Sequence, residues 1–491
     1  SGPEFRTRSA RREATSWPRG TAGNREAMSA RKIIICFDGT GNEVGDNESN
    51  ILKLYKGLAQ TDEQIVHYVP GVGTLDGPRL FGSALLNNTK SLLGLAFGMG
   101  LEDDVLDAYR FLCSTYQGPG TKAALRRRRE AGIRAAADAL GIAPPPEGTS
   151  ASDEGDRIYI FGFSRGAYAA RILAGFLHNF GVVTPDKLHL IPGAFRAYRL
   201  VTDLDRKQPD SVIFKKLRQF DEVLSPDPDV PIRALGLFDT VASMARFSRP
   251  LRTFWKWRSP MELGTHANVM RNRSVRIVLH AQAVDERRSM FRALPWVPSE
   301  FHGNRFKIPA RERQQYVEQR WFPGYHSDVG GTPREYYSGL GKITLLWMLD
   351  RLAEFEAEAD AEDNRASAPG LVLKQRYRRE FLEGRNRERR TPAGDPFAQP
   401  DTLAPMHPSM APGWWPLEIL PKTTKRREWP QRGGWGWYIP WGEPRLIPGD
   451  HVIDASVYDR MRRWRFYRPV NVPALDDMNM RPLSGYLTPD G

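Results

Sequence analysis

Short apolar runs alternate along the chain with polar segments that have a helical pattern. The apolar runs predict strands over residues 31–37, 157–161, 232–238, 275–280 and 319–322. Apolar residues at three- and four-residue spacing predict helices over residues 98–116, 167–180 and 343–355. Strands that are apolar almost throughout, such as RKIIICF at 31–37, are typical of a parallel sheet covered on both faces. The alternation therefore predicts an α/β fold with a mostly parallel, doubly wound sheet.

Shifts in composition predict the domain organisation. Residues 1–27 are highly charged, lack apolar periodicity and precede Met28, so they are expected to be an expression-vector remnant or a disordered extension. The main domain is expected over residues 28–340, with an inserted helix and loop at about 117–156 and a possible lid at about 245–265. Residues 341–491, which include a Trp- and Pro-rich region, are expected to pack on this domain as an extension, in which 452–467 fits either an edge strand or a helix.

The pentapeptide Gly162-Phe163-Ser164-Arg165-Gly166 lies between a predicted strand and a predicted helix that begins with small residues. It matches the G-x-S-x-G pattern of a nucleophile elbow, a tight turn that exposes a serine hydroxyl. The flanking glycines suit this turn because a Cβ atom at either position would clash. The pattern also occurs in ordinary Gly-rich turns, but its position between strand and helix favours the elbow. We therefore predict that Ser164 is a nucleophile and that the fold is α/β-hydrolase-like.

A serine nucleophile needs an imidazole that accepts its proton and a carboxylate that orients this imidazole. In α/β-hydrolases these partners follow the serine in the order acid, then histidine. Asp239 ends the predicted strand at 232–238, and His326 follows the one at 319–322. Both positions are at carboxyl ends of strands, where α/β sites assemble. We assign Asp239 as the acid and His326 as the base.

Other residues compete for these roles. Asp285 also follows a predicted strand and is an alternative acid. His280 and His302 are alternative bases, although His280 lies within a strand pattern and is more typical of a core or supporting histidine. Asp328 lies two residues after His326 and could anchor that loop.

Ester hydrolysis also needs two backbone N–H groups directed at the developing oxyanion. We expect one from Arg165, directly after the serine, and the other from Gly39 or Thr40 in the turn Asp38-Gly39-Thr40-Gly41. This turn superficially resembles the D-x-D-G-T signature of aspartyl-phosphate phosphatases. Those enzymes attack with the first aspartate, and Cys36 occupies that position here, which argues against a phosphatase.

Composition excludes several classes of protein. The chain has 491 residues, 40% of them hydrophobic, and no apolar stretch approaches the ~20 residues of a spanning helix. We expect a soluble globular protein with neither a transmembrane segment nor a signal peptide. Two cysteines cannot form a disulfide framework or a zinc knuckle, and no cluster has metal-ligand spacing, so no metal or other cofactor is expected. The formal net charge of +13 favours an anionic partner such as a phospholipid surface or nucleic acid.

Two segments combine aromatic and basic residues. In residues 246–258, Phe254, Trp255 and Trp257 alternate with arginines and a lysine, which is typical of a lid or a membrane contact at headgroup depth. A basic loop whose aromatic rings pack on the core is the alternative. The tryptophans of residues 414–441 could stack nucleic-acid bases, but a Pro/Trp-rich segment that buries its own rings is favoured, and no nucleic acid is expected as a partner.

Several motifs, in order along residues 31–335, resemble one known family. They are FDGTGN (37–42), NILKL (50–54), GVGT (71–74), FGFSRGAYAAR (161–171), LFDTV (237–241), HAQAVDERR (280–288) and WFPGYHSDVGG (321–331). Together they are similar to the Tle1-like phospholipase effectors of type VI secretion systems. The insertion at 117–156 is not part of this family pattern, and no secretion adaptor domain can be recognised in the sequence.

The resemblance implies a Ser-His-Asp hydrolase that cleaves acyl esters of glycerophospholipids, with phospholipase A activity and an acyl-enzyme intermediate. By this resemblance the nucleophile, acid and histidine fall on Ser164, Asp239 and His326, and the framework positions on His280, Asp285 and Arg287. It also implies peripheral membrane contact, and a protein that is cytoplasmic in the producing cell and could leave it as an effector, with a secretion or immunity partner. Two alternatives stay open: a carboxylesterase or lipase for other acyl esters, and a non-catalytic basic protein that binds membranes or nucleic acid.

Overall fold

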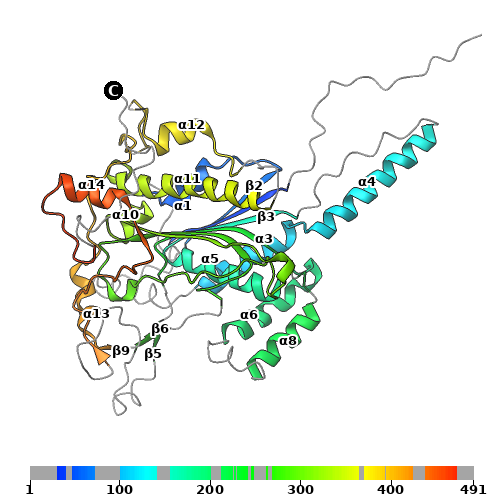
Figure 1. Cartoon of the computed structure of the whole chain (residues 1–491), viewed down its shortest axis with the longest axis horizontal. Helices are drawn as coiled ribbons and strands as arrows, with labels where there is room; N and C mark the ends of the chain where they lie inside the picture. Colours follow the sequence, from blue (N-terminus) through cyan, green and yellow to red (C-terminus); the bar gives the residue numbers. More distant parts are fainter. Residues whose placement is uncertain are drawn as a thin grey trace, which may run out of the picture.

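A seven-stranded parallel sheet forms the centre of the molecule (Figure 1). The computed structural model describes residues 30–39, 47–71, 100–140, 155–200, 212–224, 226–227, 229–241, 245–247, 261–263, 268–363, 370–386, 388–392, 394–423 and 437–472. The strands of the sheet are β1 (Lys32–Phe37), β2 (Gln64–Val69), β3 (Arg157–Phe163), β4 (Ile232–Phe238), β7 (Val275–Ala283), β8 (Tyr316–Phe322) and β11 (Val452–Ile453). Two small antiparallel pairs are β5 (Ala245–Phe247) with β6 (Met261–Leu263) and β9 (Lys422–Thr423) with β10 (Trp437–Tyr438).

The strand order is β2-β1-β3-β4-β7-β8-β11, and every neighbouring pair in this sheet is parallel. The chain leaves β1 for β2 on one side and then returns to β3 on the other, so the direction of winding switches between β1 and β3. In open α/β sheets the crevice at such a switch, at the carboxyl ends of the strands, is where ligands bind. The predicted doubly wound α/β fold is confirmed.

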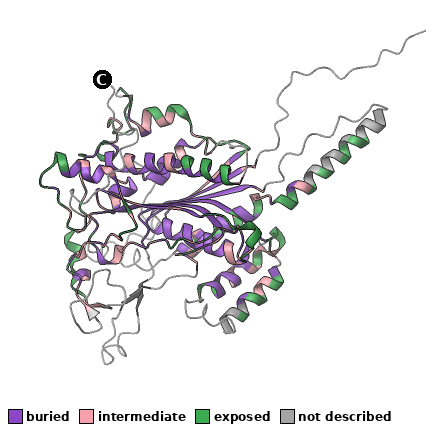
Figure 2. Ribbon diagram, in the orientation of Figure 1, coloured by how far each residue is buried: buried purple, intermediate pink, exposed green. Residues whose placement is uncertain are grey.

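Helices cover both faces of the sheet (Figure 1). One face carries α1 (Asn50–Gly57) and α11 (Gly339–Glu362), and the other carries α3 (Leu101–Thr115), α5 (Arg165–Phe180), α6 (Ile191–Arg199) and α8 (Val212–Leu224). Successive side chains of a strand enter opposite layers, so Ile33 and Ile35 join one core while Ile34 and Cys36 join the other. Figure 2 shows the sheet buried almost throughout, as its apolar sequence predicts.

The other α-helices of the described residues lie outside these two layers or are short. They are α4 (Pro119–Leu140), α10 (His326–Gly330), α12 (Gln375–Tyr377), α13 (Trp415–Ile419) and α14 (Ala455–Arg463). Helix α4 occupies part of the expected insertion and projects from the body of the molecule (Figure 1).

The C-terminal part of the chain packs against the β8 side of the sheet. Residues 452–467, for which the sequence favoured neither state, provide both the edge strand β11 and helix α14. Val457 and Tyr458 of α14 pack on Trp321 of β8 in a third apolar core. Helix α11 spans the expected domain boundary at residue 340 and lies on the central sheet, so the polypeptide around that boundary is part of the main core.

Candidate active site

Ser164 occupies a sharp turn between β3 and α5. Its backbone has φ +57° and ψ −122°, a combination that a residue with a side chain rarely adopts and that costs on the order of 1–3 kcal/mol. A Cβ atom on Gly162 would lie 2.5 Å from the carbonyl oxygen of Gly166, and one on Gly166 would lie 2.4 Å from that of Asp38. Only glycine therefore fits at either position, and the close approach at Gly166 brings the turn after β1 against the serine turn.

The serine, the histidine and the aspartate form one chain of hydrogen bonds. His326 Nε2 lies 2.7 Å from Ser164 Oγ, and His326 Nδ1 lies 2.5 Å from Asp239 Oδ2. Asp239 directly follows β4, and its N–H donates to Ala281 O of β7. His326 is the first residue of α10, just after β8. The structure thus brings together three predicted residues that are separated by 75 or more positions in sequence.

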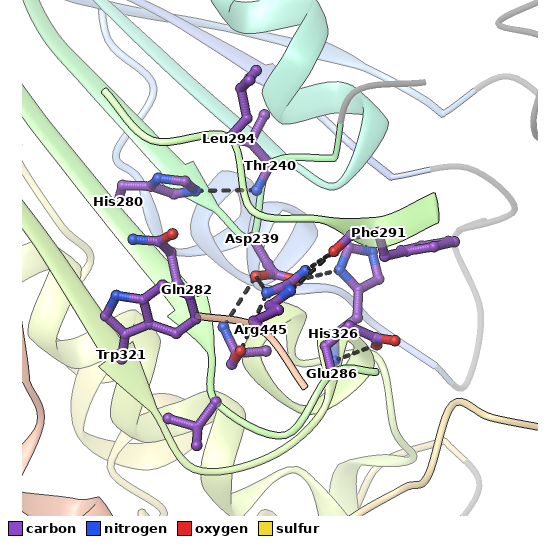
Figure 3. A network of polar contacts seen from close by, with 12 residues as sticks. Asp239, Thr240, His280, Gln282, Glu286, Phe291, Leu294, Trp321, His326 and Arg445 are labelled. Atoms are coloured by element: carbon purple, nitrogen blue, oxygen red, sulfur yellow. Dashed lines mark hydrogen bonds and ion pairs between the residues drawn. The ribbon is translucent and has the colours of Figure 1, made fainter. Parts of the chain in front are cut away.

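A residue that the sequence reasoning missed completes the surroundings of Asp239. The guanidinium of Arg445 binds both carboxylate oxygens, with Nη1 2.5 Å from Oδ1 and Nη2 3.0 Å from Oδ2 (Figure 3). The N–H of Ala283 also donates to Oδ1, at 3.0 Å. Arg445 lies 206 residues after Asp239, in a Pro-rich stretch without a recognisable motif, so no local signal could have identified it.

The charges in the site set the protonation states of the acid and the base. Burial alone would raise the pKa of Asp239, but Arg445 and His326 outweigh burial and hold this pKa well below its usual range. Burial lowers the pKa of His326, an effect that Asp239 partly offsets. At neutral pH the site therefore contains a carboxylate and a neutral imidazole, and the Nε2 atom of this imidazole can accept a proton from the serine.

Aromatic rings contact the His326 ring, and a buried ion pair holds its backbone. Phe163 stacks on the imidazole with ring centres 4.9 Å apart, and Phe291 meets it edge-on at 5.0 Å. The backbone N–H of His326 donates to Glu286 Oε2 at 3.4 Å. Glu286 also pairs with Arg288, which outweighs the effect of burial and lowers the pKa of this carboxyl to about 2.

The expected oxyanion donors lie in different situations. Arg165 is the first residue of α5, directly after Ser164, so its N–H points out of the amino end of that helix. The N–H of Gly39 donates to the carboxylate of Asp38 at 2.6 Å, so it would have to exchange this partner to bind an oxyanion. Thr40 lies outside the described residues.

The rival acid and bases do not contact Ser164 or His326 through any hydrogen bond among the described residues. Asp285 Oδ2 accepts from the N–H of Gly324 and from the hydroxyl of Tyr467, each at 2.8 Å. His280 is fully buried within β7, where its Nε2 accepts from the N–H of Thr240, next to Asp239. His280 therefore supports the turn that contains Asp239.

His302 lies at the other end of the sheet. It lines a cavity of about 430 Å³ together with Arg157 and Ile232, which begin β3 and β4. This cavity is at the amino ends of the strands, whereas Ser164 is at the carboxyl ends, so His302 cannot act on the serine.

The loop that contains His326 is fixed by Asp328, as expected. Asp328 Oδ2 accepts from the N–H of Tyr325 at 2.9 Å, and its Oδ1 lies 2.7 Å from His407 Nδ1. The second contact raises the pKa of His407 and ties the C-terminal part of the chain to α10.

Other expectations concern metals, membranes and the lid. Among the described residues no group of three or more His, Cys, Asp or Glu side chains could hold a metal ion. Within the same residues no helix has both the length and the apolar character needed to cross a bilayer. Phe254, Trp255 and Trp257, the expected lid or membrane contact, lie outside the described residues.

Comparison with known proteins agrees with the resemblance read from the motifs. Residues 31–351 match the family described as the catalytic domain of Tle1-like type VI secretion phospholipase effectors. The chain belongs to this family. An uncharacterized protein of Saccharomyces cerevisiae, YEL023C, is 27% identical over 303 residues, which are 59% of this chain and 37% of the yeast protein. The chain thus spans little more than a third of the length of that relative.

Two solved structures are also similar to this chain. An uncharacterized protein from Pseudomonas aeruginosa is 21% identical, with a TM-score of 0.34, and the match covers 71% of this chain and 47% of the other. The Tle1 effector bound to the VgrG spike of the type VI secretion system is 20% identical, with a TM-score of 0.27, and the match covers 63% and 53%. Likenesses at this level do not bear on the site.

Proposed function

We propose that the protein is a serine hydrolase that cleaves acyl ester bonds of glycerophospholipids, with phospholipase A-type activity. The observation that carries this proposal is the chain of hydrogen bonds from Ser164 through His326 to Asp239, which starts at a strained strand-to-helix turn. Membership of the Tle1-like catalytic family supports a phospholipid as the substrate.

In the proposed mechanism Ser164 Oγ attacks the ester carbonyl carbon while His326 Nε2 takes the hydroxyl proton. Asp239 stabilises the imidazolium that forms. The N–H of Arg165, with a second donor from the turn after β1, binds the oxyanion of the tetrahedral intermediate. His326 then gives its proton to the departing lysophospholipid oxygen, and an acyl-serine ester is left.

Deacylation repeats these steps with water as the nucleophile. His326 takes one proton from the water, the resulting oxygen attacks the acyl-serine carbonyl, and Ser164 leaves with the proton that His326 returns. The products are a fatty acid and the regenerated enzyme. No cofactor is needed, because each half-reaction uses only proton transfer and addition–elimination at one carbonyl carbon.

Contact with a lipid surface is part of the proposal, and an exposed apolar patch beside the site supports it. This patch consists of Trp415, Ile419, Leu420 and Trp441, which are 42%, 46%, 45% and 60% exposed. Trp415 and Ile419 share one side of α13, and the N–H of Trp441 donates to the carbonyl of Glu418 in the same helix. Exposed tryptophan side chains favour the headgroup region of a bilayer.

The patch is connected to the catalytic histidine through aromatic rings. Trp414, next to the patch, meets Phe291 edge-on at 5.4 Å, and Phe291 in turn meets His326. A phospholipid that leaves a bilayer at the patch would therefore have a short path to Ser164. We propose that this side of the molecule faces the lipid.

Delivery belongs to the proposal as well. Membership of an effector family supports release through a type VI secretion system, with a secretion partner in the producing cell and an immunity partner that blocks the site there. Co-purification of the tagged chain with components of that system from a producing strain would test this delivery.

The experiment that tests the activity compares the protein with Ser164→Ala. Labelling by a fluorophosphonate is measured alongside fatty-acid release from phosphatidylglycerol and phosphatidylethanolamine vesicles. Both signals are expected for the wild type, and neither is expected for the variant. Labelling without release, followed by turnover of short-chain esters, would instead support a carboxylesterase. A chain that is not labelled but binds anionic vesicles with strong salt dependence would contradict the hydrolase and favour a binding protein.

A further inference from the structure

One side chain that binds Asp239 comes from outside the residues that match the family. Arg445 lies 94 residues beyond residue 351, where the family match ends, and it is only 1% exposed. Its backbone is held as well, because Asn471 Nδ2 donates to the carbonyls of Arg445 and Val284, each at 3.0 Å. The chain thus places this guanidinium firmly at the carboxyl end of β7.

All five N–H groups of Arg445 have an acceptor. Nη1 donates to Asp239 Oδ1 and to the carbonyl of Ala283, at 2.5 and 3.2 Å. Nη2 donates to Asp239 Oδ2 at 3.0 Å and to the carbonyl of Phe291, and Nε donates to the same carbonyl at 2.9 Å. A guanidinium has five donors in a rigid planar fork, and a lysine ammonium has three on a flexible stem. Only arginine can satisfy this set of acceptors.

These contacts join three segments of the site whose relative positions determine its geometry. Asp239 is at the end of β4, Ala283 is at the end of β7, and Phe291 is the residue whose ring packs on His326. Asp239 Oδ2 is shared between His326 Nδ1 and Arg445 Nη2. The guanidinium therefore fixes the direction in which the carboxylate faces the imidazole.

We propose that Arg445 is a positioning residue of the active site, and that the C-terminal part of the chain completes the triad by fixing Asp239 through both of its oxygens. The inference rests on the proposed hydrolase function for its kinetic consequence. Its structural content, an imidazole–carboxylate pair oriented by a distant arginine, can be tested without turnover.

The charged groups that face His326 determine the expected pH effect. They are Asp239 from β4, Glu286 and Arg288 from the loop after β7, and Arg445 from the C-terminal part of the chain. Removal of the Arg445 charge leaves Asp239 free to stabilise the imidazolium more strongly. The pKa of His326 should therefore rise, and the acid limb of kcat/KM should move to higher pH by about one unit.

The main experiment uses Arg445→Gln in the full chain. The expected result is a fall in kcat/KM on the order of a hundredfold at the optimum, because a small displacement of a catalytic group has effects of this size. The acid limb should move up as described. In parallel, the pKa of His326 is measured by NMR of ¹⁵N-histidine-labelled protein, with its signal assigned through His326→Gln. This second measurement needs no substrate, so it separates failure of the inference from failure of the proposed function.

Two further variants serve as controls. Arg445→Lys keeps the charge but loses the fork, so we expect the acid limb to stay near that of the wild type while the rate falls. Arg276→Gln removes an equally buried arginine at the amino end of β7, which pairs with Glu362 and donates to the carbonyl of Gln314. It should lower thermal stability without moving the acid limb.

Two results would overturn the inference. One is a folded Arg445→Gln protein with the pKa of His326 unchanged and kcat/KM within about twofold of wild type. The other applies if Arg445→Gln does not fold, and it is an Arg445→Lys protein with the full wild-type rate. In both cases the guanidinium would be a structural ion pair without influence on the triad.

Discussion

Charged side chains are buried both at the amino ends of the sheet's strands, called here the amino edge, and at their carboxyl ends, called the carboxyl edge. Only the carboxyl edge has the parts of the candidate site. At the amino edge, Arg233 of β4 donates to Asp360 at 2.7 Å and to Glu356 at 3.4 Å, and the hydroxyl of Tyr159 donates to Glu356 at 2.5 Å. At the carboxyl edge, the chain of contacts begins at Arg445, passes through Asp239 and then His326, and reaches Ser164. The amino-edge network joins only cations, carboxylates and a phenol.

The difference lies in what each network can transfer. In the amino-edge network every contact offsets part of the desolvation cost of burying a charge, as in an ordinary structural ion pair. The carboxyl edge adds a neutral imidazole between a carboxylate and a hydroxyl, and it holds that hydroxyl on a backbone with φ +57°. Buried charge by itself therefore does not indicate a site, whereas a proton acceptor beside a strained serine does.

The largest effect is expected for Ser164→Ala at the carboxyl edge. Loss of the nucleophile should lower kcat for phospholipid hydrolysis by a factor on the order of a million. The unfolding temperature should stay near that of the wild type, because alanine removes one hydroxyl only. Fatty-acid release measured by titration tests this expectation, and retention of more than about 1% of the wild-type activity would contradict the assignment of the nucleophile.

Asp239→Asn should have the next largest effect. An amide favours the wrong imidazole tautomer, so kcat should fall on the order of 10⁴-fold. The same change leaves Arg445 without its carboxylate in a buried position, which should cost about 3–5 kcal/mol of unfolding free energy. Steady-state kinetics and urea denaturation on one preparation measure the two effects. A variant with normal stability would show that the Arg445 pair is weaker than its geometry indicates.

The pH dependence of the wild type gives a smaller, graded effect. His326 must be neutral to accept the serine proton, and burial lowers its pKa below the ordinary value of 6.5. The rate should therefore persist below pH 6.5 and then fall about tenfold per pH unit under the pKa of His326. A profile of kcat/KM between pH 4 and 8 measures the midpoint. A midpoint above 6.5 would contradict the conclusion that burial lowers the pKa of His326 by more than the Asp239 charge raises it.

Trp415→Ala should weaken binding to phospholipid vesicles roughly tenfold, from the loss of one indole at the lipid surface. The turnover of a soluble short-chain ester should stay unchanged, because the patch lies outside the triad. Trp464→Ala, at an exposed tryptophan after α14, is the matched control and should bind as the wild type does. If both variants lost the same amount of vesicle binding in a sedimentation assay, the result would contradict a specific role of the patch in lipid contact.

The smallest effect on hydrolysis is expected at the amino edge. Arg233→Met leaves Glu356 and Asp360 without their main cation, so the unfolding free energy should fall by about 3–5 kcal/mol. The kcat/KM of the folded variant should stay within about twofold of wild type. A large kinetic loss at temperatures where the protein is folded would show that the two edges are coupled, and would weaken the contrast between them.

Much of the fold and part of the candidate site followed from local sequence patterns. The apolar runs predicted β1, β3, β4, β7 and β8, although β8 begins three residues earlier than expected, at Tyr316. Strand β2 was not expected, because hydrophobic and polar residues alternate only weakly in Gln64–Val69. Four of its six residues are partly exposed in the structure. The serine turn was recognisable from its G-x-S-x-G pattern between strand and helix. Contacts within five residues demand glycine at Gly162, whereas the distant turn after β1 demands it at Gly166.

Ser164 and Asp239 directly follow strands, and His326 lies four residues after one. These residues could be proposed from the sequence because parallel strands bring their carboxyl ends to one edge. Only the tertiary structure decided that Asp285 binds Tyr467, that His302 lies at the opposite edge, and that Arg445 binds the carboxylate of Asp239. Contacts of this kind join residues that no spacing rule relates. They depend on how the C-terminal part of the chain folds back over β7 and β8, and that path is set by packing of distant surfaces.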